Sequence, residues 1–113
     1  MVRDEGKRNE MFSVLADDIA DWGERFLRVE AAGGRKSAEQ LLGGIAEWLG
    51  SDLVDGMPVM PLERWELLDA LAEELLQGCR ACIAGEPGAG QQLRDIIRRA
   101  REMATCESLK KDA

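Results

Sequence analysis

Two cysteines, Cys79 and Cys82, have the spacing that most directly suggests chemistry. The C-x-x-C pattern is used by redox proteins and by zinc sites. Reactive pairs lie at helix N-termini, where the helix dipole stabilises the thiolate, but these two fall near the C-terminal end of a predicted helix. Zinc needs four ligands, and the chain has no histidine and only one further cysteine, Cys106. We therefore predict buried structural thiols and no metal site.

A glycine-rich segment, residues 85–92, resembles the start of a P-loop, because Gly85 and Gly90 have the G-x-x-x-x-G spacing. The motif continues with Lys and then Ser or Thr, whereas this chain has Gln91 and Gln92. A P-loop also follows a buried strand, and this segment follows a predicted helix. We interpret it as a turn between helices, and we predict no cofactor.

The chain lacks the side chain that enzymes use most often as a general base, since it contains no histidine. Ser-His and Cys-His nucleophiles and the Glu-x-x-His pairs of di-metal bundles are therefore excluded. Carboxylates are abundant, but no pair of them is marked out by its spacing. We predict that the protein is not an enzyme.

The elements that position these residues are predicted to be helices, because apolar residues recur at alternating steps of three and four. We expect helices over residues 5–32, 37–49, 62–84 and 91–106. The stripe of the first helix consists of Phe12, Leu15, Ile19, Trp22, Phe26 and Val29, and that of the third of Trp65, Leu68, Ala72, Leu75, Cys79 and Cys82.

Glycine and proline set the predicted boundaries. Gly33-Gly34 ends the first helix, Ser37 and Gln40 form a capping box, and Gly50 ends the second helix. We expect a neighbouring backbone to approach closely at Gly43-Gly44. The fold class predicted is all-α, a four-helix antiparallel bundle with one long connection between helices 2 and 3. Residues 1–113 are expected to form a single helical domain, frayed over 1–5 and 108–113.

The formal net charge of −7 excludes general affinity for phosphate backbones, so nucleic acid is an unlikely partner. The N-terminal residues are highly charged, and no apolar run approaches membrane-spanning length. We expect a cytoplasmic protein that does not bind a membrane.

The connection between helices 2 and 3 carries an unusual number of apolar residues for a segment exposed to water. Either it packs onto the bundle, or it forms an apolar patch that binds a partner protein. The candidate patch consists of Trp48, Leu53, Val54, Met57, Val59, Met60 and Trp65.

Acidic residues on helices 1 and 3 fall mostly outside the apolar stripes. Solvated helix faces account for such a pattern. Alternatively, these faces form a negative surface that competes with nucleic acid for a basic groove, as small inhibitors and some antitoxins do. The candidate residues are Asp17, Asp18, Asp21, Glu24, Glu66, Asp69 and Glu73.

The fourth helix is locally basic, with arginines at positions 94, 98, 99 and 101, and invites comparison with a DNA recognition helix. Asp95 and Glu102 interleave with these arginines, so pairing within the protein is an alternative explanation.

We predict a non-enzymatic cytoplasmic protein–protein interaction module that acts by occupying a partner's surface. The alternatives are an inhibitor or antitoxin of phage or mobile-element type, which blocks a nucleic-acid-binding protein through the acidic faces, and a dimeric DNA-binding regulator that uses helix 4. A homodimer that shares the apolar stripe of helix 1 is also considered.

Overall fold

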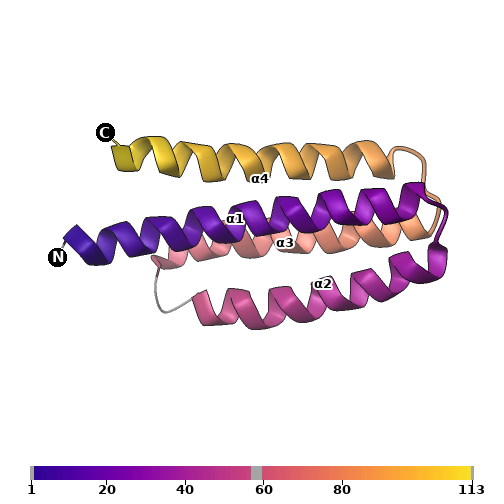
Figure 1. Cartoon of the computed structure of the whole chain (residues 1–113), viewed down its shortest axis with the longest axis horizontal. Coiled ribbons are helices and arrows are strands. Elements are labelled where there is room, and N and C mark those ends of the chain that lie inside the picture. The colour runs from indigo at the N-terminus through magenta and orange to yellow at the C-terminus, as the bar shows by residue number, and fades with distance from the viewer. Residues whose placement is uncertain (1, 57–59, 113) are drawn as a thin grey trace.

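The fold is entirely helical over the residues that the structure describes. The computed structural model describes the backbone of residues 2–56 and 60–112 and the side chains of residues 11–55 and 60–105. Four helices, α1 (Val2–Ala31), α2 (Arg35–Gly56), α3 (Leu62–Ile83) and α4 (Ala89–Asp112), are present, and no strand occurs in these ranges (Figure 1). The predicted all-α fold class is confirmed.

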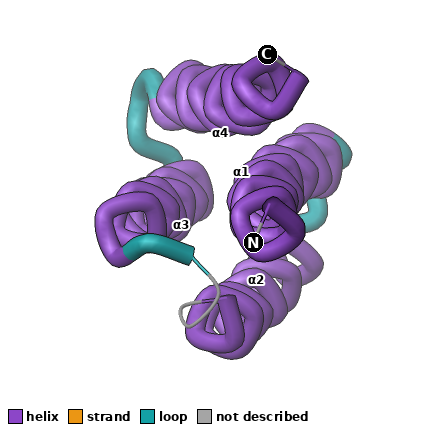
Figure 2. Tube along the Cα trace, turned by 90° about the vertical axis from the view of Figure 1, so that its left-hand side faces the viewer, coloured by secondary structure: helices purple, strands orange, loops and turns teal. Residues whose placement is uncertain are grey.

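The helices pack side by side in an elongated body with extents of 49, 25 and 19 Å. Helices α1 and α3 lie in the middle, with α4 on one side of the pair and α2 on the other (Figure 2). Helix α1 contacts all three other helices. The Ser13 hydroxyl, in the first half of α1, donates a hydrogen bond of 3.3 Å to the carbonyl of Ala104, in the second half of α4.

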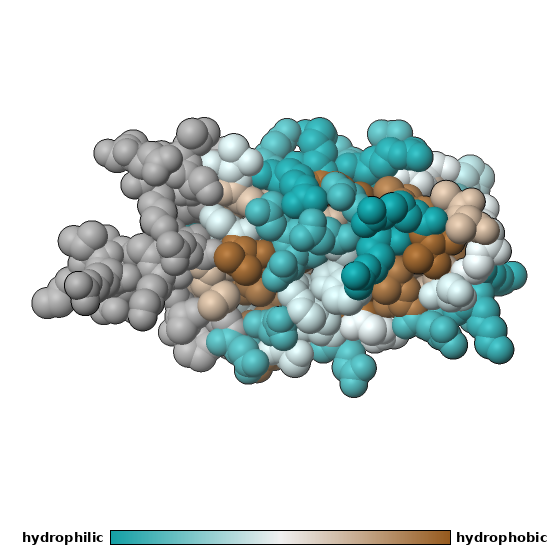
Figure 3. All heavy atoms as spheres, viewed as in Figure 1, coloured by the Kyte–Doolittle hydropathy of each residue, from teal (hydrophilic) through white to brown (hydrophobic). Residues whose placement is uncertain are grey.

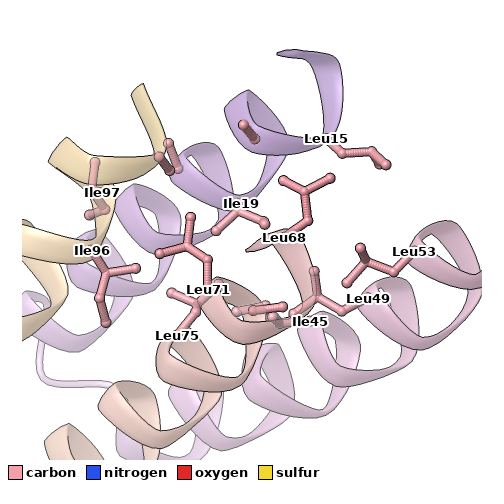
Figure 4. Close-up of a cluster of buried hydrophobic side chains, with 14 of the residues drawn as sticks. Leu15, Ile19, Ile45, Leu49, Leu53, Leu68, Leu71, Leu75, Ile96 and Ile97 are labelled. Atoms are coloured by element: carbon pink, nitrogen blue, oxygen red, sulfur yellow. The ribbon is translucent and has the colours of Figure 1, made fainter. Parts of the chain in front are cut away.

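The core forms where the apolar stripes of the four helices meet (Figure 4). Burying a leucine, isoleucine or phenylalanine side chain stabilises the fold by roughly 1.5–3 kcal/mol relative to leaving it in water. The helix 1 stripe lies inside the single chain, because Phe12, Leu15, Ile19 and Phe26 are all buried. Most of this stripe is therefore covered by the chain's own helices, and the homodimer expected to share it stays a prediction. The largest fully buried side chains are Phe26, Ile19, Ile45, Leu68, Leu75, Leu93, Ile96 and Cys79.

Two glycines allow α4 to approach the other helices closely. A Cβ atom at Gly23 would lie 2.7 Å from Cγ1 of Ile97, and one at Gly78 would lie 2.7 Å from Cδ2 of Leu93. By contrast, a Cβ at Gly43 or Gly44 would meet nothing within 4 Å. The predicted close approach at Gly43-Gly44 is wrong, because both glycines lie on the exposed side of α2.

Helix α2 is longer than predicted and continues past Gly50 to Gly56. Ile45, Leu49 and Leu53 recur at steps of four and are all buried, so core contacts extend the helix beyond the glycine. The connection to α3 is accordingly shorter than the one predicted. Helix α4 likewise extends to Asp112 rather than Cys106, and α2 begins at Arg35, ahead of the capping box expected at Ser37.

Glycines with positive φ form the two described turns, as the sequence indicated. Gly33, with φ of 81°, follows α1, and Gly85 and Gly88, with φ of 76° and 79°, lie between α3 and α4. The segment that resembles a P-loop therefore contains a turn between two helices. No helix in the described part of the chain is both long and apolar enough to span a membrane.

Candidate interaction surfaces

The C-x-x-C cysteines lie on the inner side of α3, near its C-terminal end. Cys79 is 0% exposed, and its burial, together with the neighbouring Cys82, raises the pKa of its thiol to about 12. Cys82 is half-buried, and burial followed by the charge of Glu30 raises the pKa of its thiol too. As predicted, Cys79 is a buried thiol. No group of three potential metal ligands occurs among the described residues.

The predicted apolar patch is divided between the core and the surface. Leu53 and Met60 are buried, so the part of the prediction that assigned them to an exposed patch is wrong. The indole Nε1 of half-buried Trp65 donates a hydrogen bond of 2.7 Å to the carbonyl of Leu53. Leu53 lies in the last turn of α2, where backbone carbonyls have no partner within the helix, and this bond therefore ties the end of α2 to α3.

The other described members of that patch differ in exposure. Val54 is 58% exposed. Trp48 is half-buried and lies against Trp22 of α1, with ring centroids 5.8 Å apart. Met57 and Val59 lie outside the described residues.

Three of the predicted acidic residues on α1 bind a single arginine of α4, and we call this set the Arg101 cluster. Arg101 donates hydrogen bonds to Asp17 (3.0 Å), Asp21 (2.7 Å) and Glu24 (3.1 Å). The pKa of the Arg101 guanidinium is raised, chiefly by its hydrogen bond to Asp21. These carboxylates are neutralised within the chain, a role that sequence reasoning missed because Arg101 lies more than 75 residues away from each of them.

Asp18 differs from its neighbours because it forms no ion pair in the described part of the chain. Its side chain is partly buried between α1 and α2. Removal from water raises the pKa of this carboxyl, and the nearby charges of Asp21, Asp52 and Asp17 raise it further.

A groove of about 410 Å³ lies beside Asp18, between α1 and α2. It is lined by Asp18, Asp21, Trp22, Arg25, Arg28 and Trp48. The guanidinium of Arg25 lies 5.2 Å from the centroid of the Trp22 ring, a cation–π contact. On the face seen in Figure 3, where α1 lies in front of α3, hydrophilic residues cover most of the surface.

The predicted acidic residues on α3 lie in a different environment. Glu66, Asp69 and Glu73 are all exposed, and none forms an ion pair with another described residue. We call these three residues the α3 acidic face. Two exposed leucines, Leu62 and Leu67, each 57% exposed, belong to the same helix. Neither leucine was predicted from the sequence as part of a binding surface, although Leu62 precedes Glu66 by four residues and so lies on the same side of the helix.

The arginines of α4 mostly bind carboxylates of the protein itself. Arg98 pairs with Asp95 and Glu102 on its own helix. Arg99 donates two hydrogen bonds, of 2.8 and 3.2 Å, to Glu74 on α3. Arg94 is exposed. The basic character of α4 is thus largely used to attach it to α1 and α3.

Comparisons of the chain with protein-family models, with curated proteins and with solved structures find no match.

Proposed function

We propose that the chain is an antiparallel four-helix bundle that serves as a non-enzymatic protein–protein interaction module. In this proposal the outer side of α3 is the binding surface, and it occupies a positively charged region of a partner protein. The contacts between α1 and α4 run in opposite order along the two helices: Ser13 meets Ala104, Asp17 meets Arg101, and Gly23 lies against Ile97. This order supports an antiparallel arrangement of α1 and α4.

The observation that carries the proposal is the combination of unpaired carboxylates with exposed leucines on one helix. Glu66, Asp69 and Glu73 have no compensating cation among the described residues, unlike the acids of the Arg101 cluster. Unpaired charges of one sign attract a partner of opposite sign and orient it. Leu62, on the same side as these carboxylates, and Leu67, about 100° farther around the helix, add apolar area that gains free energy when a partner removes it from water.

A more specific form of the proposal is an inhibitor or antitoxin that blocks a nucleic-acid-binding protein. The α3 acidic face presents carboxylates at helical steps of three and four, and a groove that binds phosphates would attract such a row. The alternative of a DNA-binding regulator has less support, because Arg98, Arg99 and Arg101 already bind carboxylates.

The proposal is tested by affinity capture from the native host, with bound proteins identified by mass spectrometry. The bait is the unmodified chain or the triple variant Glu66→Gln, Asp69→Asn, Glu73→Gln. The control bait, Glu39→Gln, Glu47→Gln, Asp55→Asn, removes the same charge from exposed positions of α2. We expect a partner that the unmodified and control baits retain and the α3 variant loses.

Changes of ionic strength and substitutions of the two leucines separate the electrostatic contribution of this surface from its apolar contribution. Retention through the carboxylates should weaken steeply at high ionic strength, whereas retention through apolar contact should not. Leu62→Ser with Leu67→Ser should reduce retention at both salt concentrations. Equal retention of every bait would show that the partner binds elsewhere, and a DNA mobility shift by the unmodified chain at low salt would favour the regulator instead.

A further inference from the structure

The outward side of α1 carries two acids followed by two bases, namely Asp18, Asp21, Arg25 and Arg28, and we call these the α1 charge stripe. Their steps of three, four and three place all of them along one side of the helix. The four positions are symmetric about residue 23: two lie two residues from it, and two lie five residues from it. A rotation of 180° about that midpoint therefore exchanges the acidic half with the basic half.

The two outermost members of the stripe are without an ion-pair partner in the described part of the chain. Neither Asp18 nor Arg28 forms an ion pair with any described residue. They are ten residues apart, which corresponds to about 15 Å along the helix, so they do not reach each other. Asp18 is also partly desolvated without a cation to compensate for it. The stripe thus contains an unpaired acid and an unpaired base that a second, inverted copy would bring together.

We propose that the α1 charge stripe is the contact surface of a homodimer, in which α1 of a second copy lies antiparallel to α1 of the first. In this arrangement Asp18 faces Arg28 of the second copy. Asp21, which also accepts a hydrogen bond from Arg101 of its own chain, faces Arg25 of the second copy. Each pair occurs twice, because a two-fold axis makes the two contributions identical.

The surroundings of the stripe fit such a contact. The half-buried rings of Trp22 and Trp48 line the groove beside its centre, and aromatic side chains are enriched in the buried parts of protein interfaces. Beyond the charged residues, exposed Val14 and Ala32 are related by the same rotation about residue 23 and would place an apolar contact on each side.

This dimer uses a different surface from the α3 acidic face, so it goes beyond the proposed function, and either can fail without the other. It also differs from the dimer through the apolar stripe of helix 1, most of which is covered by the chain's own helices. Because each copy carries a net charge of −7, the local opposite charges must overcome a general repulsion. We therefore expect an association that depends strongly on these four residues.

The test is the oligomeric state of charge-reversed chains, measured by analytical ultracentrifugation over a wide range of protein concentration. The unmodified chain should dimerise. Asp18→Arg places two like charges at each contact of its own dimer, as does Arg28→Asp, so each variant alone should dimerise on the order of tenfold more weakly or worse. An equimolar mixture of the two variants restores opposite charges at both contacts and should recover the dimer.

Two control variants make the same charge changes elsewhere. Glu86→Arg, at an exposed position between α3 and α4, and Arg80→Asp, at an exposed position of α3, should leave dimerisation unchanged. Circular dichroism and thermal unfolding establish that each variant is folded before its mass is measured. A monomeric unmodified chain at the highest concentration would overturn the proposal. So would dimers of the single variants as strong as those of the unmodified chain, or a mixture that stays monomeric.

Discussion

The acids of α1 and those of the α3 acidic face are similar in sequence but differ in what lies opposite them. On α1, Asp17, Asp21 and Glu24 face α4 and share Arg101. On α3, the carboxylates point away from the bundle and have no cation among the described residues. A run of acids therefore indicates either internal attachment or an available surface, and the neighbouring helix decides which one applies.

The difference has a steric origin as well as an electrostatic one. Gly23 has no side chain, so Ile97 can lie directly against α1, and this close approach brings Arg101 within reach of the α1 acids. The outer side of α3 has no helix packed over it (Figure 2). Close packing thus determines which carboxylates are neutralised.

The largest effect is expected from closing the gap that Gly23 leaves. Gly23→Leu should lower the free energy of unfolding by about 3 kcal/mol, because even its Cβ would lie 2.7 Å from Ile97 Cγ1. The same substitution at Gly43, where nothing lies within 4 Å, should change it by less than about 1 kcal/mol. Urea denaturation measures both values. Equal losses would mean that close approach at Gly23 does not matter.

A smaller effect is expected from removing the cation of the Arg101 cluster. Arg101→Ala should lower the free energy of unfolding by about 1–2 kcal/mol, since three half-exposed carboxylates lose their shared partner and repel one another. Arg98→Ala, which removes exposed pairs formed only within α4, should lower the free energy of unfolding clearly less than Arg101→Ala does. The difference between the two variants should shrink in high salt, and a difference that is insensitive to salt would contradict the electrostatic explanation.

Substitution of Asp18 should raise the stability of the chain, whereas the two preceding substitutions lower it. Its pKa is raised in the folded chain, so the charged carboxyl opposes folding above pH 3.8, the ordinary value, and the protonated form does not. Asp18→Asn should therefore raise the melting temperature at neutral pH, by about 1–3 °C after allowance for solvent screening. The gain should disappear below about pH 3.8.

This measurement is made at low protein concentration, so that the proposed dimer does not contribute to the melting temperature. Asp55→Asn, at an exposed position of α2, serves as the control and should leave the melting temperature nearly unchanged. A lower melting temperature for Asp18→Asn at neutral pH would show that the charge of Asp18 stabilises the chain through a contact with a cation.

The smallest effect on stability is expected at the α3 acidic face. Neutralising Glu66, Asp69 and Glu73 together should change the free energy of unfolding by no more than about 0.5 kcal/mol, because they make no ion pair with a described residue. Denaturation of the triple variant measures this value. A loss comparable to that of Arg101→Ala would show that the face serves the fold, and the proposed function would lose its main support.

The sequence was sufficient to predict the helices and their inward sides, because the alternation of three and four steps repeats the geometry of a helix. It predicted the end of α2 poorly. Gly50 and the Asp55-Gly56 turn signal indicated a break, but the buried side chains of Leu49 and Leu53 favour helix more strongly than one glycine opposes it.

Properties that depend on which helices become neighbours could not be predicted. The sequence contains Gly23, Gly43, Gly44 and Gly78 without showing which of them meets another helix, and the expectation at Gly43-Gly44 was wrong. The division of the acids into neutralised and unpaired groups depends equally on contacts with α4. The hydrogen bond from Trp65 to the Leu53 carbonyl is a further case, since no sequence pattern specifies it.

The complete burial of Cys79 gives the chain an internal reporter of its own opening. A thiol-labelling reagent needs access to the sulfur, and it reacts with the thiolate. In the folded chain the Cys79 sulfur is buried, and its raised pKa keeps it protonated. With the other two cysteines replaced by serine, the rate of labelling would follow how often the bundle opens around the C-terminal end of α3, much as amide hydrogen exchange does. Conditions or partners that loosen the contact between α3 and α4 would then register as faster labelling, with no added dye or tag.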